Sequence, residues 1–280
     1  MLLRGAAYTD PMDQVLAFIG GGNMASAIIG GLVASGRSAT SILVVEPFDE
    51  QRRRLRSDHG VTAFAAADAS LAHAALVVWA VKPQFFKQAA APCFAHVSRA
   101  LQLSVMAGIR SDAIAAAAGT ERVVRAMPNT PALIGQGIAG LYARAAATAG
   151  DRAFVEQVLA PTGRTLWVAH EADLDAVTAL SGSGPAYVFY FVEAMMQAAV
   201  EMGLSAEQGK QLALATFTGA SELALRSSDP PELLRARVTS KGGTTYAALA
   251  TLEAAGVKAA FVKALAAAQQ RARELGDEFG

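Results

Sequence analysis

The sequence predicts two domains, an α/β domain of the Rossmann type followed by an all-α domain. With 280 residues the chain exceeds the length that one hydrophobic core usually serves. Short apolar runs alternate with helical stretches up to about Val168, the pattern of a parallel sheet with crossover helices. Beyond His170 good helix formers dominate and no further strand is expected. We expect a flexible extension at residues 1–12, the α/β domain at 13–170 and the helical domain at 171–280.

Seven apolar runs predict the strands of the first domain. Because these runs are apolar without alternation, we expect strands that are covered on both faces. The predicted strands are residues 15–20 (VLAFIG), 42–46 (ILVVE), 75–81 (ALVVWAV), 101–105 (LQLSV), 122–126 (RVVRA), 138–143 (IAGLYA) and 165–169 (TLWVA).

The helices expected in the second half are apolar on more than one face, as at residues 185–203 and 259–276. A helix that is apolar all round must be buried. About 110 residues offer little to cover such helices, so we expect a subunit interface to supply the cover. The alternative is one compact monomeric bundle.

Composition limits the partners and the compartment. Lys plus Arg equals Asp plus Glu at 24 each, so no overall field favours nucleic acid or an anionic membrane, and a small-molecule substrate fits better. The single cysteine, Cys93, excludes an internal disulfide framework and suits a reducing cytoplasm. Residues 1–14 do not resemble a signal peptide, and the longest apolar run, 74–81, is too short to span a membrane. We therefore expect a soluble, cytoplasmic protein.

A glycine-rich turn follows the first predicted strand and opens a helix at residues 15–36. Gly20, Gly22 and Ala25 match the G-x-G-x-x-G/A spacing of dinucleotide-binding turns. The first glycine makes the tight turn, the second lets backbone approach a pyrophosphate, and free amides at the helix start face the phosphates. The alternative is a glycine turn that serves close packing alone.

Glu46 ends the second predicted strand, where an acid commonly hydrogen-bonds the adenosine ribose of NADH and disfavours a 2′-phosphate. The basic run at residues 51–56 begins just afterwards, and Arg52 or Arg53 could bind that phosphate instead. The alternative for this run is a solvated helix face. The choice between NADH and NADPH stays open at this point.

Two further strand ends carry polar, proline-containing loops. Residues 80–84 (AVKPQ) include Lys82 and Pro83, and residues 125–137 (RAMPNTPALIGQG) hold two prolines around Asn129. Proline stiffens a loop, and ligands of open α/β sheets lie beyond the carboxyl ends of the strands. Both loops are therefore candidate cofactor contacts, although each also fits an ordinary turn between strand and helix.

Five segments in this order resemble the pyrroline-5-carboxylate reductase family. They are FIGGGNMASAI (18–28), AVKPQ (80–84), RAMPNTPA (125–132), VTALSGSGPAYVF (177–189) and VTSKGGTT (238–245), and the resemblance covers residues 15–275. It implies a Rossmann domain followed by an all-α dimerisation domain, a homodimer and a possible larger ring of dimers. It also implies reduction of L-1-pyrroline-5-carboxylate to L-proline, the last step of proline biosynthesis, with NADPH or NADH as the cofactor.

The resemblance also implies roles for individual positions. Cofactor binding falls to Gly20, Gly21, Gly22, Asn23, Met24, Ala80, Val81, Lys82, Pro83, Met106 and Ala107. Substrate binding falls to Val238, Ser240, Gly242, Gly243, Thr244 and Thr245. In this reading the glycine pair lets several amides meet the substrate carboxylate, and the threonines supply hydroxyls.

The expected chemistry asks for positioning rather than a strong acid. A protonated imine is already electrophilic, so Thr245 is expected to orient the ring nitrogen or to donate its proton. Lys82 is the second catalytic candidate, although a cation beside an iminium would repel it and cofactor binding suits it better. Lys241 replaces the proline that many relatives carry, while Arg237 and Met106 also depart from the family pattern, which leaves their individual contacts open.

Other classes of protein fit the sequence less well. β-Hydroxyacid dehydrogenases share the two-domain plan but rely on a lysine of the helical domain; the candidates are Lys210, Lys241, Lys258 and Lys263. A non-catalytic nucleotide-sensing protein would have no use for the Gly-Gly-Thr-Thr loop. Residues 181–185 (SGSGP) lack the G-x-S-x-G spacing of a hydrolase and predict a helix start instead. The four histidines are scattered, so no metal site is expected.

Overall fold

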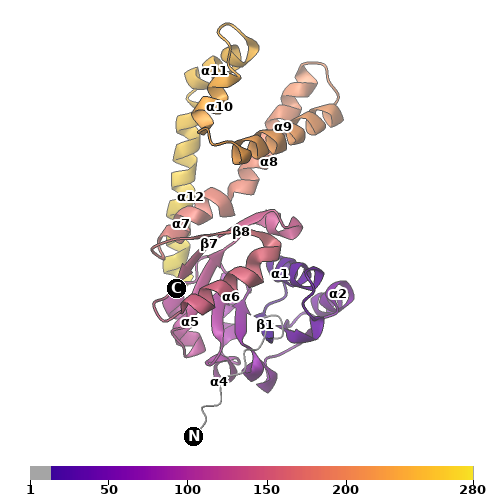
Figure 1. Ribbon diagram of the computed structural model, residues 1–280, viewed down its shortest axis with the longest axis vertical. Coiled ribbons are helices and arrows are strands. Elements are labelled where there is room, and N and C mark those ends of the chain that lie inside the picture. Colours follow the sequence, from indigo (N-terminus) through magenta and orange to yellow (C-terminus); the bar gives the residue numbers. More distant parts are fainter. Residues whose placement is uncertain (1–13, 280) are drawn as a thin grey trace. The chain divides into compact units, whose positions relative to one another are not determined.

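The computed structural model describes residues 14–279, so the extension expected at 1–12 lies outside the described residues. The chain forms two compact units (Figure 1). The first runs to Ser183 and also includes the chain from Ala268 onward, and the second is Gly184–Ala267. These units do not coincide with the division expected at residue 170, because residues 171–183 and the end of the last helix pack with the first unit.

The first unit is built around an eight-stranded sheet with the order β3-β2-β1-β4-β5-β6-β7-β8. The strands are β1 (Leu16–Ile19), β2 (Ile42–Val45), β3 (Thr62–Phe64), β4 (Leu76–Trp79), β5 (Leu101–Ser104), β6 (Val123–Met127), β7 (Gly137–Ala143) and β8 (Gly163–Trp167). Its α-helices are α1 (Asn23–Ala34), α2 (Asp49–His59), α3 (Phe86–Ala90), α4 (Phe94–Val97), α5 (Ser111–Ala118), α6 (Ala149–Leu159) and α7 (Asp173–Val177). The sequence order reverses at β1, which lies between β2 and β4, as in a doubly wound Rossmann sheet.

The sheet carries a hydrophobic core on each face. Successive side chains of a strand point to opposite faces, so Leu16 and Phe18 join the core under α1, α2 and α6. Ala17 and Ile19 join the other core, which lies under α3, α4 and α5. All four side chains are at most 1% exposed. This two-sided burial explains why the strands are apolar without alternation.

All seven strands predicted from the sequence are present, with ends that differ by at most two residues. The additional strand, β3, was not predicted. It has only three residues at the edge of the sheet, and Thr62 is exposed. So short a run gives little apolar periodicity, which is why the sequence does not reveal it.

One strand pair runs against the expectation of a parallel sheet. β6 and β7 are antiparallel, with Arg125 opposite Tyr142, while every other neighbouring pair is parallel. Residues 128–136, which connect them, hold only the 3₁₀-helix η4 (Thr130–Ile134). A parallel connection needs a crossover of about a dozen residues or more, so this short, proline-containing link returns the chain antiparallel.

The second unit consists of helices. They are α8 (Gly184–Glu201), α9 (Ala206–Arg226), α10 (Pro231–Arg237), α11 (Thr244–Ala254) and α12 (Val257–Phe279), of which α12 belongs to this unit as far as Ala267. α8 and α9 lie side by side, and a capping box of Ser205 and Gln208 starts α9. Among the described helices, none is both long enough and apolar enough to cross a membrane.

Large apolar side chains lie exposed on this unit in the single chain. Phe189 is 57% exposed on α8, and Leu223 is 61% exposed on α9. Apolar surface of this kind marks an interaction site when it is contiguous. The observation agrees with the expectation that these helices require cover from a second subunit.

One polar group of the first unit permits a test of pH-dependent stability. Asp151 caps α6 together with Thr148, and it accepts a hydrogen bond of 2.6 Å from Nη2 of Arg122. Burial raises the pKa of Asp151, but the hydrogen bonds from Arg122 and Thr148 outweigh this effect, so the pKa lies below its usual value. A lowered pKa stabilises the fold above the pKa of the unfolded chain, and this stabilisation is lost as the pH falls through the folded-state value.

We expect Asp151→Asn to lower the free energy of unfolding by about 1–3 kcal/mol at pH 7, because Arg122 and the helix start lose a charged partner. The difference from the wild type should begin to shrink below about pH 4, the usual pKa of the carboxyl group in the unfolded chain, and should be lost as the pH falls through the lower folded-state pKa. Urea unfolding at several pH values measures both effects. The control Asp58→Asn, at an exposed position, should stay within about 0.5 kcal/mol of the wild type. A loss of stability that does not vary with pH would contradict this account.

Candidate functional site

The candidate cofactor residues gather at one edge of the sheet in the first unit. β1, β4 and β5 are neighbours, and their carboxyl ends lead into the loops at residues 20–22, 80–83 and 106–107. Hydrogen bonds hold these loops in register, from the amide of Ala80 to the carbonyl of Ile19 at 2.8 Å and from Val105 to Trp79 at 3.0 Å. Three segments far apart in the sequence therefore lie side by side, where ligands of Rossmann sheets bind.

Gly20 allows the turn to lie against the neighbouring strand end. Its φ is +97°, a conformation that side chains disfavour, and its amide donates to the carbonyl of Val45 at 2.8 Å. A Cβ atom at this position would lie 2.7 Å from the carbonyl oxygen of Ala80 and 2.9 Å from Cγ1 of Val81. Gly20 thus joins the glycine turn to the segment at residues 80–83.

The next two glycines have different surroundings. A Cβ at Gly21 would lie 2.5 Å from Cδ1 of Leu55, so a side chain at this position would require Leu55 to shift. Gly22 is exposed, is the N-cap of α1, and would have nothing within 4 Å of an added Cβ. Open space at a helix start, with amides that the helix leaves free, fits a pyrophosphate. The residues present therefore suit the dinucleotide that the spacing predicts.

The remaining predicted cofactor residues differ in what they can offer. Asn23 and Lys82 are exposed beside this edge, while Met24, Ala80, Val81, Pro83 and Ala107 are half-buried. The Met106 side chain is only 3% exposed and belongs to a hydrophobic core. Met106 can therefore face a cofactor only with its backbone, although its amide already donates to Oγ of Ser104 at 3.2 Å.

Glu46 lies beside the glycine turn, with 6% of its surface exposed. Its Oε2 accepts a hydrogen bond of 2.9 Å from the amide of Gly21. Arg52 and Arg53 both form ion pairs with Asp49, each at 3.0 Å. The carboxylate is thus placed at the turn, while the two candidate phosphate-binding arginines are paired with an acid of their own helix.

The predicted substrate loop lies in the second unit, between α10 and α11. Gly242 has a φ of +75°, and the amide of Gly243 donates to the carbonyl of Ser240 at 3.0 Å, so the loop turns tightly into α11. An ion pair between Arg237 and Asp229 fixes the end of α10 just before the loop. These contacts fix the backbone of the loop between α10 and α11.

The groups that this loop presents are polar and accessible. Ser240, Lys241, Gly242 and Thr244 are exposed, Thr245 is half-buried, and Val238 is 66% exposed. No described residue forms a hydrogen bond with the hydroxyl of Thr244 or Thr245. Together with the free amides of the first turn of α11, these hydroxyls can bind a small anion.

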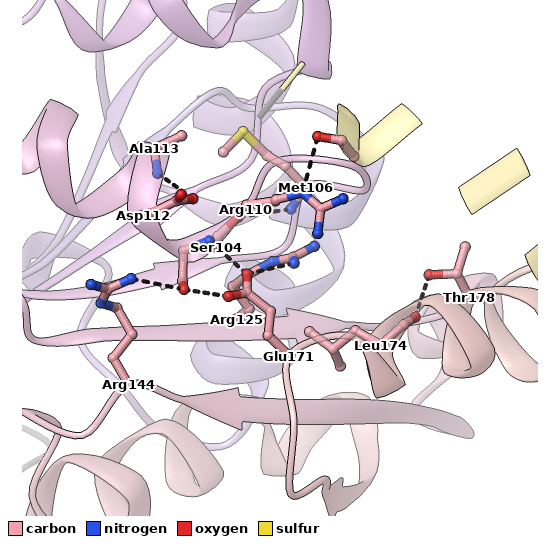
Figure 2. A network of polar contacts seen from close by, with 12 residues as sticks. Ser104, Met106, Arg110, Asp112, Ala113, Arg125, Arg144, Glu171, Leu174 and Thr178 are labelled. Atoms are coloured by element: carbon pink, nitrogen blue, oxygen red, sulfur yellow. Dashed lines mark hydrogen bonds and ion pairs between the residues drawn. The ribbon is translucent and has the colours of Figure 1, made fainter. Parts of the chain in front are cut away.

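A polar network that the sequence did not reveal stabilises the loop after β5 (Figure 2). Oε1 of Glu171 accepts hydrogen bonds from the Ser111 amide at 2.6 Å and from Nη1 of Arg125 at 2.8 Å. Oε2 accepts from the Ser111 hydroxyl at 2.5 Å, and Arg144 donates to the same hydroxyl at 3.2 Å. Glu171 thus joins the start of α5 to β6, and Arg144, which follows β7, contacts the same Ser111 hydroxyl. These partners are too distant in sequence for any pattern to pair them.

The acid Asp175 lies near the same network. Burial raises its pKa above the usual value, and the nearby carboxylate of Asp277 acts in the same direction. Arg110, Arg125 and Arg273 oppose this effect without reversing it. Arg110 in turn pairs with Asp277 at 2.5 Å, so the end of α12 is attached to the loop that follows β5.

Three further features of the described residues bear on other chemistry: possible metal ligands, the Cys93 thiol and a cavity. Among residues 14–279, no three His, Cys, Asp or Glu side chains gather in a way that could hold a metal ion. Burial raises the pKa of Cys93 to about 11, so its thiol stays protonated and unreactive near neutral pH. A cavity of about 440 Å³ is lined by Gln14, Arg99, Arg122 and their neighbours. These residues precede the strands, so the cavity lies at the opposite edge from the glycine turn.

The fold and the glycine turn define a dinucleotide-dependent oxidoreductase with a separate helical unit. Two family models match the chain, "NADP oxidoreductase coenzyme F420-dependent" over residues 15–108 and "Pyrroline-5-carboxylate reductase dimerisation" over residues 171–275. The pyrroline-5-carboxylate reductase of Pseudomonas aeruginosa is 44% identical over 95% of this chain and 98% of its own length. The chain belongs to the pyrroline-5-carboxylate reductase family, and its helical domain is the dimerisation domain of a homodimer.

Relatives from other organisms match nearly the whole chain. The pea pyrroline-5-carboxylate reductase is 36% identical over 94% of this chain and 96% of its own length. The Coxiella burnetii enzyme structure matches with a TM-score of 0.88 at 35% identity, over 94% of this chain and 98% of that one. A Plasmodium falciparum pyrroline carboxylate reductase with NADP bound matches with a TM-score of 0.85 at 28% identity, over 95% and 99%. The predicted family, fold class and reductase function are thereby confirmed, whereas the roles of individual residues stay predictions.

Two alanine substitutions distinguish an effect on stability from an effect on dinucleotide binding. Gly22→Ala should leave the melting temperature nearly unchanged, because its Cβ meets no neighbour, and weaken dinucleotide binding by about tenfold or more, because the methyl group enters the phosphate space. Gly20→Ala should destabilise the protein by roughly 2 kcal/mol or more, through its positive φ and its contact with Ala80. Thermal unfolding and titration by nicotinamide fluorescence measure the two effects. Unchanged affinity in Gly22→Ala would mean that this turn does not bind the phosphates.

Proposed function

We propose that this chain reduces L-1-pyrroline-5-carboxylate to L-proline with NADH or NADPH, the reaction of the family to which it belongs. Membership over nearly the full length supports the reaction. The observation that carries it is the pair of features on the two units: a glycine turn open to phosphates and a helix start that presents free amides and hydroxyls. The first suits a dinucleotide and the second a small carboxylate.

On the cofactor side, the chain contributes shape and amides. Gly20 and Gly21 fix the turn, and Gly22 leaves room beside the amides of α1 for the pyrophosphate. Asn23, Lys82 and the half-buried segment at residues 80–83 border the same edge, where we assign them cofactor binding. A bound nicotinamide supplies the hydride, so the chain itself needs no redox-active group.

On the substrate side, the loop at residues 238–245 is assigned to the carboxylate. Gly242 and Gly243 turn the backbone so that the first amides of α11 point outward, and the dipole of this helix favours an anion there. Lys241 is exposed within the loop and adds a positive charge. A lysine in place of proline also supplies one more backbone N–H group.

Thr245 is assigned to the ring nitrogen. It is half-buried in the first turn of α11, so its position is better fixed than that of the exposed Thr244. Its hydroxyl is a weak acid, and the protonated imine already attracts hydride, so orientation is its main contribution. We assign Lys82 to the cofactor rather than to proton transfer, because a cation would repel the iminium.

The assembly and location follow the same proposal. We assign cofactor binding to residues 13–170 and substrate binding with dimerisation to residues 171–280. We further propose that the homodimers assemble into a larger ring and that the enzyme works in the cytoplasm. The exposed apolar side chains of α8 and α9 support the interface, and the protonated thiol of Cys93 is compatible with a reducing compartment.

Substitution of Thr245 tests the substrate assignment. We expect Thr245→Ala to lower kcat/KM for pyrroline-5-carboxylate by about 10- to 100-fold, the effect of about one to two lost hydrogen bonds. Thr245→Ser keeps the hydroxyl and should recover most of the rate. NADH oxidation followed at 340 nm gives the kinetics, and nicotinamide fluorescence gives the cofactor affinity, which should not change.

A matched control lies on the same helix. Thr251 donates to the carbonyl of Ala247 at 3.1 Å and lies outside the loop, so Thr251→Ala should leave kcat/KM within about twofold. Equal losses in Thr245→Ala and Thr251→Ala would indicate damage to α11 rather than loss of a substrate contact. Cofactor binding without turnover of pyrroline-5-carboxylate in the wild type would contradict the proposed reaction.

A further inference from the structure

Glu46 is a buried carboxylate held in one orientation beside the glycine turn. Its Oε2 accepts from the amide of Gly21 at 2.9 Å, and its Oε1 accepts from the amide of Phe48 at 3.0 Å. Its own amide donates to the carbonyl of Phe64 at 2.9 Å. Backbone groups from three segments therefore fix both the main chain and the carboxylate of this residue.

This orientation leaves the carboxylate able to accept further hydrogen bonds. Two carboxylate oxygens offer about four lone-pair sites, of which the two backbone amides use two. At the end of the second strand of a dinucleotide-binding fold, the neighbouring ligand group is the adenosine ribose. Its hydroxyls can donate to an ionised acid, whereas a 2′-phosphate has no such donor and repels it.

The arginines that could reverse this preference are engaged elsewhere. Nη1 of Arg52 donates to the carbonyls of Glu46 at 2.9 Å and Pro47 at 2.7 Å, and its Nη2 pairs with Asp49 at 3.0 Å. The Arg52 side chain is only 17% exposed, and it braces the backbone that carries Glu46. Arg53 is 70% exposed and pairs with Asp49 at 3.0 Å.

The start of α2 also discourages a phosphate. Asp49 and Glu50 occupy its first turn, where a helix N-terminus would otherwise attract an anion. Three acids thus lie within residues 46–50. Of the four arginines at residues 52–56, the two nearest these acids, Arg52 and Arg53, are paired with Asp49. The groups next to the Glu46 carboxylate therefore favour a ligand with neutral hydroxyl donors.

We propose that Glu46 makes this reductase select NADH over NADPH by binding the adenosine ribose hydroxyls and excluding a 2′-phosphate. Arg52 acts as a positioning residue for the backbone around Glu46 and does not bind phosphate. The inference rests on the proposed role of the glycine turn in cofactor binding. It distinguishes this chain from the Plasmodium falciparum relative, whose structure has NADP bound.

Calorimetry with ADP-ribose and 2′-phospho-ADP-ribose tests the adenosine site without involving catalysis. The wild type should bind ADP-ribose at least about tenfold more tightly, and NADH and NADPH titrated by fluorescence should show the same order. Glu46→Gln keeps an oxygen for the Gly21 amide but removes the charge, so the preference should fall by about tenfold. Thermal unfolding of each variant shows that it is folded.

Two further variants complete the design. Glu50→Gln removes a negative charge at a nearby exposed position, in the first turn of α2. It should leave the ratio of the affinities for ADP-ribose and 2′-phospho-ADP-ribose within about twofold of the wild-type ratio. Arg52→Ala should not weaken the binding of 2′-phospho-ADP-ribose more than the binding of ADP-ribose. This result tests the proposal even if Glu46→Gln fails to fold. The proposal would be overturned if the wild type bound 2′-phospho-ADP-ribose as tightly as ADP-ribose or more tightly. It would also be overturned if Arg52→Ala lost binding of 2′-phospho-ADP-ribose alone. If neither ligand binds, the proposed role of the glycine turn fails as well.

Discussion

The lack of a side chain at Gly20 is the constraint on which the candidate cofactor site depends. With a φ of +97° and the carbonyl of Ala80 close by, this residue turns the chain away from β1 directly against the end of β4. The close approach places the next amide, that of Gly21, where it can donate to Glu46. It also lets α1 start beside the loops at residues 80–83 and 106–107. One backbone position thus brings together the phosphate, ribose and nicotinamide sides of the expected cofactor site.

The two units solve the problem of burial in different ways. The sheet buries apolar side chains on both faces within one chain, so its strands can be uniformly apolar. The helical unit leaves side chains such as Phe189 and Leu223 exposed, and they require the second copy of a homodimer. Association is therefore part of folding the helical unit, and we expect the stability of this unit to depend on protein concentration.

The sequence predicts what local patterns encode. Apolar runs reveal seven strands, and the glycine spacing reveals the turn at residues 20–22, because each depends on residues close together in the chain. The three-residue β3 and the antiparallel direction of β7 escape prediction, since β3 has no periodicity and the direction of β7 depends on the length of a loop. The sequence also does not show which way a side chain points. Met106 is a candidate cofactor residue, yet its side chain is buried in the core.

Long-range polar contacts are the part of the site that the sequence could not supply. Glu171 accepts from Ser111 and Arg125 across 60 and 46 positions, and no spacing rule pairs such residues. The orientation of Arg52 is local, yet the sequence leaves it undecided, because an arginine beside a nucleotide site can bind either a phosphate or backbone carbonyls. Only the competing acceptors, Pro47 and Asp49 among them, decide the outcome.

Neutral composition and binding of a charged cofactor are compatible because the attraction is local. The chain carries equal numbers of acidic and basic side chains, and the first turn of α1 contains no acid that would oppose a phosphate. Backbone amides and helix dipoles supply partial positive charge that is fixed in direction and does not attract anions at a distance. A site built in this way discriminates by the groups placed around it. In the proposed function, Glu46 at the ribose side and the hydroxyls of Thr244 and Thr245 select the ligand, while the backbone amides bind the phosphate or carboxylate that these groups admit.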